Sequence, residues 1–311
     1  MTFYSGDDAR NEYIYKFVTK ARYKRSSRGE ILDEGTLYVA RFNDNGTGEW
    51  LPLDINDRRF QAAMRNKGVH FQDQADVLVN TRLAADTAGA TKMDRPEWIV
   101  VHPHTNEVYA ALTNNSARTA DDTDSANPRP GNPYGHIIRW REQGNRNWAT
   151  RFFWDIYVLA GPESDSQITP AVNGAALTQD NIFASPDGLR IDTNGILWIS
   201  TDMSGSQQGE GPFGNNSLLA ANPVTGQIKR FLSGPIDAEI CGTVSTPDNK
   251  TMFVAIQHPG DRSQPNMFTS NWPETLFANP GNAVVLPNPS GARPRSALVA
   301  VSRDDRGMIG L

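Results

Sequence analysis

The chain has 311 residues, of which 38% are hydrophobic and 21% charged, a composition typical of one large or two ordinary globular domains. A net charge of −5 without any basic run argues against a protein that binds the phosphate backbone of DNA or RNA. The single cysteine, Cys241, rules out an internal disulfide and a cysteine-based zinc site made by this chain alone. No apolar window approaches the roughly 20 residues of a membrane span, and the N-terminus does not resemble a signal peptide.

Most of the predicted elements are short strands. The first three are 12–20, 35–43 and 48–53, and the turn NDNGTG joins the last two as a hairpin. One helix is predicted near 71–86, where apolar residues recur at steps of three and four. Two stretches rich in Pro, Asn and Asp are interpreted as long surface loops, 116–135 and 258–283. The later strands are 98–103, 108–113, 135–140, 151–161, 189–192, 196–201, 217–223, 227–232, 243–247, 251–257 and 296–304.

The hairpins repeat, in three copies (PEWIVVHPHTNEVYAALTNN, PDGLRIDTNGILWISTD and AEICGTVSTPDNKTMFVAIQH) and a looser one (GDDARNEYIYKFV). Most are followed by a second hairpin, which gives four-stranded units of roughly 50–70 residues, the pattern of β-propeller blades. A two-sheet sandwich also has regular short strands, but it would not need an acidic residue before the same strand of each copy. We therefore predict an all-β, β-propeller-like fold of about four blades. It would form a single partial domain, 1–311, with the helix packed outside it.

An acidic residue stands before the first strand of each copy. In a propeller the innermost strands all begin at one mouth of the central channel, so these carboxylates are expected to converge there. Carboxylates crowded in a channel repel one another and lose solvent, and a bound multivalent cation removes both costs. Oxygen ligands suit Ca²⁺, with Mn or Fe as further possibilities; the alternative is that each acid only caps a turn. The residues are Glu97, Asp187 and Glu239, with Asp7, Asp8 and Glu12 before the strand of the looser copy.

Arg95 lies two residues before Glu97. A guanidinium there could form a bidentate contact with a phosphate or carboxylate held by the metal. A metal with an arginine is the usual electrostatic arrangement for phosphoryl transfer. The alternative is that Arg95 simply pairs with Asp94 or Glu97.

Several segments resemble the PhoX-type alkaline phosphatases, nearly end to end: GDDARNEYIYKFV, LDEGTLYVARFNDNGTGEWLPL, TRLAADTAGATKMDRPE, AALTNNSAR, GHIIRW and TPDNKTMFVAIQHPGD. The combination of DRPE with IQHPG is specific. The resemblance implies a propeller phosphomonoesterase with a calcium and iron (Ca²⁺, Fe³⁺) cluster at the channel mouth. It also implies export to the periplasm or beyond.

The resemblance also suggests roles for individual residues. Arg95 matches the phosphate-binding arginine, and Glu97 a metal-ligand glutamate. Asp187 and Glu239 match acidic ligands within shorter motifs, and His258, in IQHPG, is expected to contact substrate. Asp8 and Glu12, with Asp7, are expected as ligands in the same way.

The sequence departs from the family in three respects. A TPWGTWLTCEE-like segment that supplies a cysteine and a glutamate ligand is absent, and Cys241 is not taken as the replacement, because a structural thiol is the commoner fate. The twin-arginine leader is absent. Four blades are fewer than the six of the family, so we expect a C-terminal part or a reduced member, with a second copy or chain as a possible partner to complete the propeller.

Two other functions fit parts of the pattern. SPDGLRIDTNGILWIST resembles the blades of calcium-dependent lactonases of the regucalcin type, although this motif occurs in many propellers and DRPE and IQHPG argue against it. A non-catalytic propeller that only binds a partner or a metal is the second. Phosphate-monoester hydrolysis without a Ser-His-Asp arrangement is the function that we predict.

Overall fold

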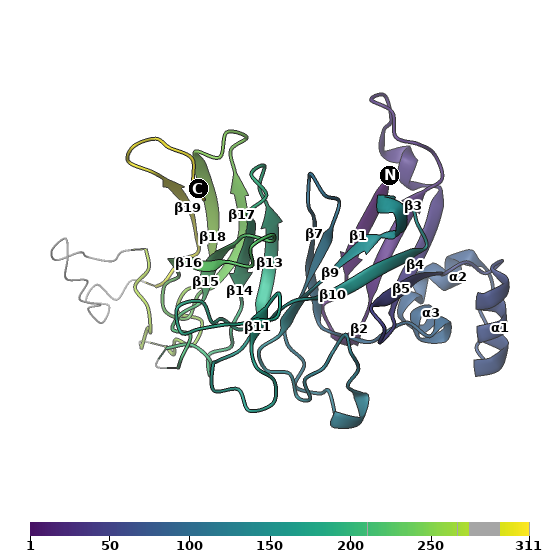
Figure 1. Cartoon of the computed structure of the whole chain (residues 1–311), viewed down its shortest axis with the longest axis horizontal. Helices are drawn as coiled ribbons and strands as arrows, with labels where there is room; N and C mark the ends of the chain where they lie inside the picture. Colours follow the sequence, from purple (N-terminus) through teal and green to yellow (C-terminus); the bar gives the residue numbers. More distant parts are fainter. Residues whose placement is uncertain (210, 266, 274–292, 311) are drawn as a thin grey trace. The chain divides into compact units, whose positions relative to one another are not determined.

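Short antiparallel strands dominate the computed structural model, which describes residues 1–209, 211–265, 267–273 and 293–310 (Figure 1). The all-β prediction is confirmed. The chain divides into two units, 1–133 with 137–157 and 134–136 with 158–311, and each is described by itself. The predicted loop 116–135 is present as a largely irregular segment, and the part of the predicted loop 258–283 beyond residue 273 lies outside the described residues.

The first unit is built on one antiparallel sheet whose strand order is β1-β3-β4-β5-β10-β9-β8-β7. It consists of two four-stranded meanders joined where β10 pairs with β5, with Phe152 opposite Gly48. The two ends of this path also approach each other, because a Cβ added at Gly6 would lie 2.6 Å from the carbonyl oxygen of Pro96. The strands are β1 (Thr2–Gly6), β3 (Ile14–Thr19), β4 (Gly35–Phe42), β5 (Thr47–Pro52), β7 (Pro96–Val101), β8 (Val108–Leu112), β9 (His136–Glu142) and β10 (Arg151–Leu159), and a short pair, β2 (Arg10–Glu12) and β6 (Met93–Asp94), lies outside this sheet.

Alternation of apolar and polar residues places the aromatic side chains of the first unit in its core. In β10, Phe152 and Trp154 are buried whereas Arg151 and Phe153 are exposed, which is the period of two expected of a strand with one buried face. Phe152 packs against Trp50 with ring centroids 5.1 Å apart, within the range of favourable aromatic pairs. The predicted NDNGTG hairpin turn is present between β4 and β5.

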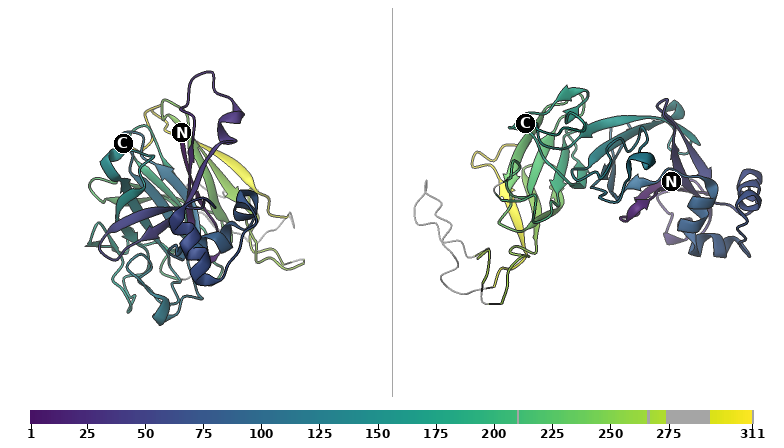
Figure 2. Two further views of the ribbon diagram at one scale, coloured as in Figure 1. Left: turned by 90° about the vertical axis from the view of Figure 1, so that its right-hand side faces the viewer. Right: turned by 90° about the horizontal axis from the view of Figure 1, so that it is seen from below.

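Three helices, blue in Figure 2, pack on the strands of the first unit. They are α1 (Arg58–Lys67), α2 (Gln74–Val79) and α3 (Thr81–Ala88). The helix predicted near 71–86 is therefore two helices, separated at Asn80, whose φ of −102° and ψ of 43° are not helical. Val77, Ala84 and Ala85 are the buried residues that attach them to the sheet.

The second unit contains two further antiparallel sheets, with the orders β13-β14-β15-β16 and β17-β18-β19. They share a core that includes Trp198, Leu218, Ile240 and Val254. Together with the two meanders of the first unit, the described residues thus form about four propeller-like sheets, as predicted. The strands are β13 (Pro186–Ile191), β14 (Leu197–Thr201), β15 (Ser217–Ala221), β16 (Ile228–Ser233), β17 (Glu239–Ser245), β18 (Thr251–Gln257) and β19 (Ala297–Ser302), and two-residue strands β11 (Ala171–Val172) and β12 (Ala175–Ala176) pair at the end of β10.

Candidate metal and phosphate site

The three acidic residues that the sequence repeat singled out share an unusual backbone geometry. Each stands at the first or second position of its strand, and two residues before it lies a non-glycine residue with a left-handed backbone. Such a conformation costs on the order of 1 kcal/mol, and residues that adopt it tend to cluster at functional sites. The pairs are Arg95 (φ 54°) before Glu97, Ser185 (φ 50°) before Asp187, and Asp237 (φ 56°) before Glu239.

The strands also bulge near these residues. In β7, Glu97 and Trp98 together face one residue of β8, because the register shifts between Pro96 and Ile99. The same shift occurs in β13 between Pro186 and Leu189. A β-bulge redirects side chains and is common beside active sites, so the sequence repeat corresponds to a repeated local structure.

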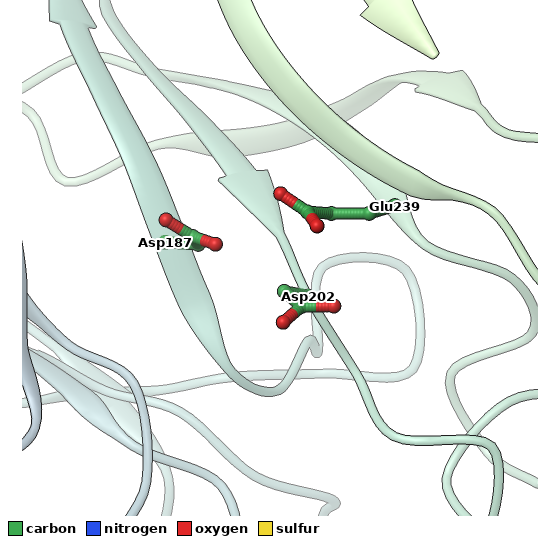
Figure 3. Close-up of side chains that lie close together, drawn as sticks. All are labelled: Asp187, Asp202 and Glu239. Carbon is green, nitrogen blue, oxygen red and sulfur yellow. The ribbon is translucent and has the colours of Figure 1, made fainter. Parts of the chain in front are cut away.

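Three carboxylates of the second unit lie close together, those of Asp187, Asp202 and Glu239 (Figure 3). One oxygen of each lies within 4.8 Å of the others. Asp187 and Glu239 are only 9% and 8% exposed. Two of the acids predicted from the sequence are therefore brought together, with Asp202 as a third.

The second unit also brings His258 to this cluster. Its Nε2 lies 3.2 Å from Oε2 of Glu239, and Nε2 of Gln257 donates to the same oxygen at 3.1 Å. Burial raises the pKa of Glu239, and the nearby charge of Asp202 raises it further, while His258 and the Cys241 thiol oppose the shift. Burial and the charge of Glu239 in turn raise the pKa of the Cys241 thiol to about 11, which keeps it protonated at neutral pH.

This donor set fits a hard cation. Three carboxylates supply only oxygen ligands, which Ca²⁺ prefers. The burial and mutual repulsion that raise the pKa of Glu239 are the costs that a bound cation would relieve. The cluster of Asp187, Asp202 and Glu239 could therefore bind a metal ion.

Arg95, in the first unit, is held in a fixed orientation by a bidentate ion pair with Asp8. Its Nε donates to Oδ1 at 2.8 Å and its Nη2 to Oδ2 at 3.0 Å. Its Nη1 donates to Oδ1 of Asn114 at 3.2 Å, and Oε1 of Glu97 lies 3.9 Å from Nη2. The guanidinium is partly exposed. Asp8 thus forms the bidentate pair with Arg95, and Glu97, one of the two partners considered from the sequence, forms a longer ion pair with it.

Asp94 has a different environment from Glu97, although only three positions separate them. Its side chain is fully buried and forms an ion pair with Nε of Arg118. Its two oxygens also accept hydrogen bonds from Asn115 and Asn132, each at 2.9 Å. Asp94 therefore organises the interior of the first unit.

The two other predicted acids of the first unit contact Arg82 of α3. Asp7 pairs with it in bidentate fashion at 2.7 and 2.8 Å, and Oε2 of Glu12 lies 3.5 Å from its Nε. Burial raises the pKa of Glu12, an effect that Arg82 opposes. Within the described residues, neither they nor Glu97 belong to a group of three ligand atoms as close as the cluster of the second unit.

The family model for the alkaline phosphatase PhoX matches residues 1–260. The chain belongs to the PhoX alkaline phosphatase family. A solved structure, Pseudomonas fluorescens PhoX in complex with vanadate, a transition-state analogue, is similar at 41% identity with a TM-score of 0.84. The alignment covers 99% of this chain and 52% of that one, so the chain spans about half the length of that PhoX protein. No curated protein matches the sequence.

The family membership and the solved PhoX structure agree with the propeller-type fold predicted from the repeat. In the part of this PhoX chain that the structure describes, no helix has the length and apolar character needed to cross a membrane. A second chain that completes the propeller, the other expectation, is supported by none of these findings.

Asp202 is the residue of the cluster that the sequence reading missed in this PhoX chain. The register of the β13–β14 hairpin pairs Pro186 with Thr201, and the backbone N–H of Asp202 donates to the carbonyl of Ser185 at 3.0 Å. Because of this pairing, Asp202, which directly follows β14, lies beside Asp187 at the start of β13. The sequence PDG…STD around the TNG turn carries that signal.

Proposed function

We propose that this chain contributes a metal-dependent phosphomonoesterase site. Membership of the alkaline phosphatase family and the likeness to a PhoX protein that binds a phosphoryl-transfer transition-state analogue support this proposal. The observation that carries it is the cluster of Asp187, Asp202 and Glu239, because its crowded, partly desolvated carboxylates are suited to hold cations. The family resemblance favours Ca²⁺ and Fe³⁺ among these.

In this proposal the clustered carboxylates are the metal ligands. Asp187, Asp202 and Glu239 bind cations through their oxygens. Glu97, in the first unit, is proposed as a metal ligand because its position in the repeat is equivalent. Cations bound there supply positive charge that stabilises the phosphoryl oxygens in the transition state. Glu12 and Asp8 are also proposed as ligands, and the carboxylates of both lie beside arginines in the structure.

Arg95 is proposed to bind the phosphoryl group. A guanidinium presents donors in a planar fork that matches the oxygens of a phosphate. Asp8 and Asn114 accept hydrogen bonds from three of its five N–H groups and fix the plane of the guanidinium, so that little side-chain freedom is lost when a substrate binds. His258, beside Glu239, is proposed as a second substrate contact whose ring is oriented by that carboxylate.

The test compares hydrolysis of p-nitrophenyl phosphate with hydrolysis of a lactone, each with and without EDTA, and identifies bound metals by elemental analysis. We expect phosphatase activity that EDTA abolishes and Ca²⁺ restores. Asp202→Asn should lower metal content and phosphatase activity together, because it removes one charged ligand. Lactone hydrolysis without phosphatase activity, or a metal content unchanged in Asp202→Asn, would refute the proposal.

A further inference from the structure

A single buried amide connects the residues that flank two of the three clustered carboxylates. Asn216 is completely buried and lies just before β15. Its Oδ1 accepts hydrogen bonds from Oγ1 of Thr201 at 2.8 Å and from the backbone N–H of Met203 at 2.7 Å. Its Nδ2 donates to the carbonyl oxygens of Ala238 at 2.9 Å and Met203 at 3.3 Å.

These contacts saturate the amide and fix its orientation. A side-chain amide can accept two hydrogen bonds and donate two, and Asn216 forms all four. The N–H of Met203 can only donate and the carbonyl of Ala238 can only accept, so the amide cannot be turned over. Neither an aspartate nor an apolar residue of the same size could satisfy both groups.

The residues that Asn216 contacts are direct neighbours of two of the clustered acids. Thr201 and Met203 are the two neighbours of Asp202, and Ala238 directly precedes Glu239. Asn216 therefore holds together the two backbone segments that carry Asp202 and Glu239. Without a cation the two acidic side chains repel each other, and the backbone ties oppose their separation.

We propose that Asn216 is a positioning residue that sets the spacing of Asp202 and Glu239 for cation binding, an inference that rests on the proposed function. The neighbours of metal ligands commonly determine metal affinity, because they decide whether the ligands are already in place before the ion arrives. If Asp202 and Glu239 are already correctly spaced, no part of the free energy of cation binding is used to bring them together. Asn216 thereby acts on the metal through the two ligands.

Arg262 joins the same two segments from the solvent side. Its Nε donates to Oδ1 of Asp237 at 2.7 Å, and its Nη1 donates to the carbonyl of Gly205 at 2.7 Å. Asp237 lies two residues before Glu239 and its side chain is buried, whereas Gly205 lies three residues after Asp202. A Cβ at Gly205 would lie 2.5 Å from Cδ of Arg262, so the absence of a side chain there allows this approach.

The test measures Ca²⁺ binding by isothermal titration calorimetry on the full chain, alongside thermal unfolding. Asn216→Ala should weaken Ca²⁺ binding by about 10- to 100-fold, the usual effect of removing a residue that orients metal ligands. Arg262→Ala should weaken it in the same direction. Half of the Arg262 side chain is exposed, and Oγ1 of Thr269 still donates to the buried Asp237 when Arg262 is replaced, so this variant is expected to fold even where Asn216→Ala does not. Wild-type Ca²⁺ affinity in it would then show that ties between these two segments do not set the spacing of the ligands.

Asp192→Asn is the matched control. Asp192 is buried at the opposite end of the β13–β14 hairpin, where its oxygens accept from the N–H groups of Asn194 and Ile196 and from Nε1 of Trp198. This variant should lower the melting temperature and leave the Ca²⁺ dissociation constant unchanged.

Three outcomes count against the proposal. Wild-type Ca²⁺ affinity in a folded Asn216→Ala variant and in Arg262→Ala overturns the positioning role alone. An equal loss of affinity in Asp192→Asn also overturns it, since general destabilisation would then explain all three variants. Absence of Ca²⁺ binding by the wild-type chain refutes the cation site itself, and the proposed function fails together with the inference.

Discussion

Replacement of Arg95 by alanine tests the phosphate-binding role most directly, because the structure separates its effect on activity from its effect on stability. The ion pair between Arg95 and Asp8 is partly exposed, with 27% and 42% of the side chains accessible. Pairs of this kind contribute at most about 1 kcal/mol to stability. Removal of one strong donor to a developing oxyanion instead reduces the rate by about 10² to 10³, or roughly 2.7–4 kcal/mol.

We therefore expect Arg95→Ala to lower kcat/KM for p-nitrophenyl phosphate by about 10²- to 10³-fold, while the metal content stays at the wild-type level. Arg95→Lys should recover only part of the loss, since an ammonium group cannot form the bidentate contact. Steady-state kinetics at saturating Ca²⁺, combined with elemental analysis, give the two quantities.

Arg139→Ala provides the matched control for this experiment. Arg139 forms a bidentate pair with Asp155 at 2.7 and 2.8 Å, and 22% and 55% of the two side chains are exposed, much as for Arg95 and Asp8. Its loss should affect stability to a similar small extent and leave kcat/KM unchanged. Equal kinetics in Arg95→Ala and Arg139→Ala would show that Arg95 only stabilises the fold.

Three further substitutions are predicted to act differently from Arg95→Ala. Glu97→Gln should lower the metal content measured by elemental analysis, with activity falling as a consequence, because a charged ligand is lost; a full metal content would contradict this role. Asp94→Asn should cost about 3–5 kcal/mol of unfolding free energy in a denaturant titration, since it leaves the charge of Arg118 buried, and an intact stability would show that the pair is dispensable. Lys16→Met should cost a similar amount near neutral pH, because Glu142 is buried beside it at 2.9 Å. Burial already raises the pKa of Glu142, and without Lys16 it should rise further. The loss of stability should therefore grow as the pH rises above the ordinary carboxyl range, where the unfolded carboxyl releases its proton and the folded one holds it; a pH-independent loss would refute this.

The repeat of apolar hairpins predicted much of the fold because it is a local signal. Each copy carries its own alternation, turn residues and acid, so one sequence is enough to predict equivalent positions such as Asp187 and Glu239. The boundaries and number of the helices were harder to predict from the sequence. Helix α1 buries only Phe60 and Met64, too few apolar residues for a clear period, and the break at Asn80 depends on one backbone conformation.

The partners of the predicted residues could not be derived in the same way. Asp8 and Arg95 are 87 positions apart, and they meet because β2 pairs with β6, with Arg10 opposite Asp94. Pairing of two short segments across such a distance leaves no periodic trace in one chain. Asp202, by contrast, follows from hairpin register once the turn has been located, so it was within reach of the sequence.

Asp94 and Glu97 lie on either side of the left-handed Arg95 and have different environments. β6 ends at Asp94, whose carboxylate is buried among amide and guanidinium donors, and β7 begins only after the chain has turned at Arg95. Glu97 lies in the bulge of β7 between Pro96 and Ile99, and its side chain is 16% exposed. Ser185 and Asp237 have the same conformation before Asp187 and Glu239, and neither is a glycine, which would adopt it without strain. A strained turn at three equivalent positions, each followed by an acid, is the pattern that the proposed metal binding by these acids would require.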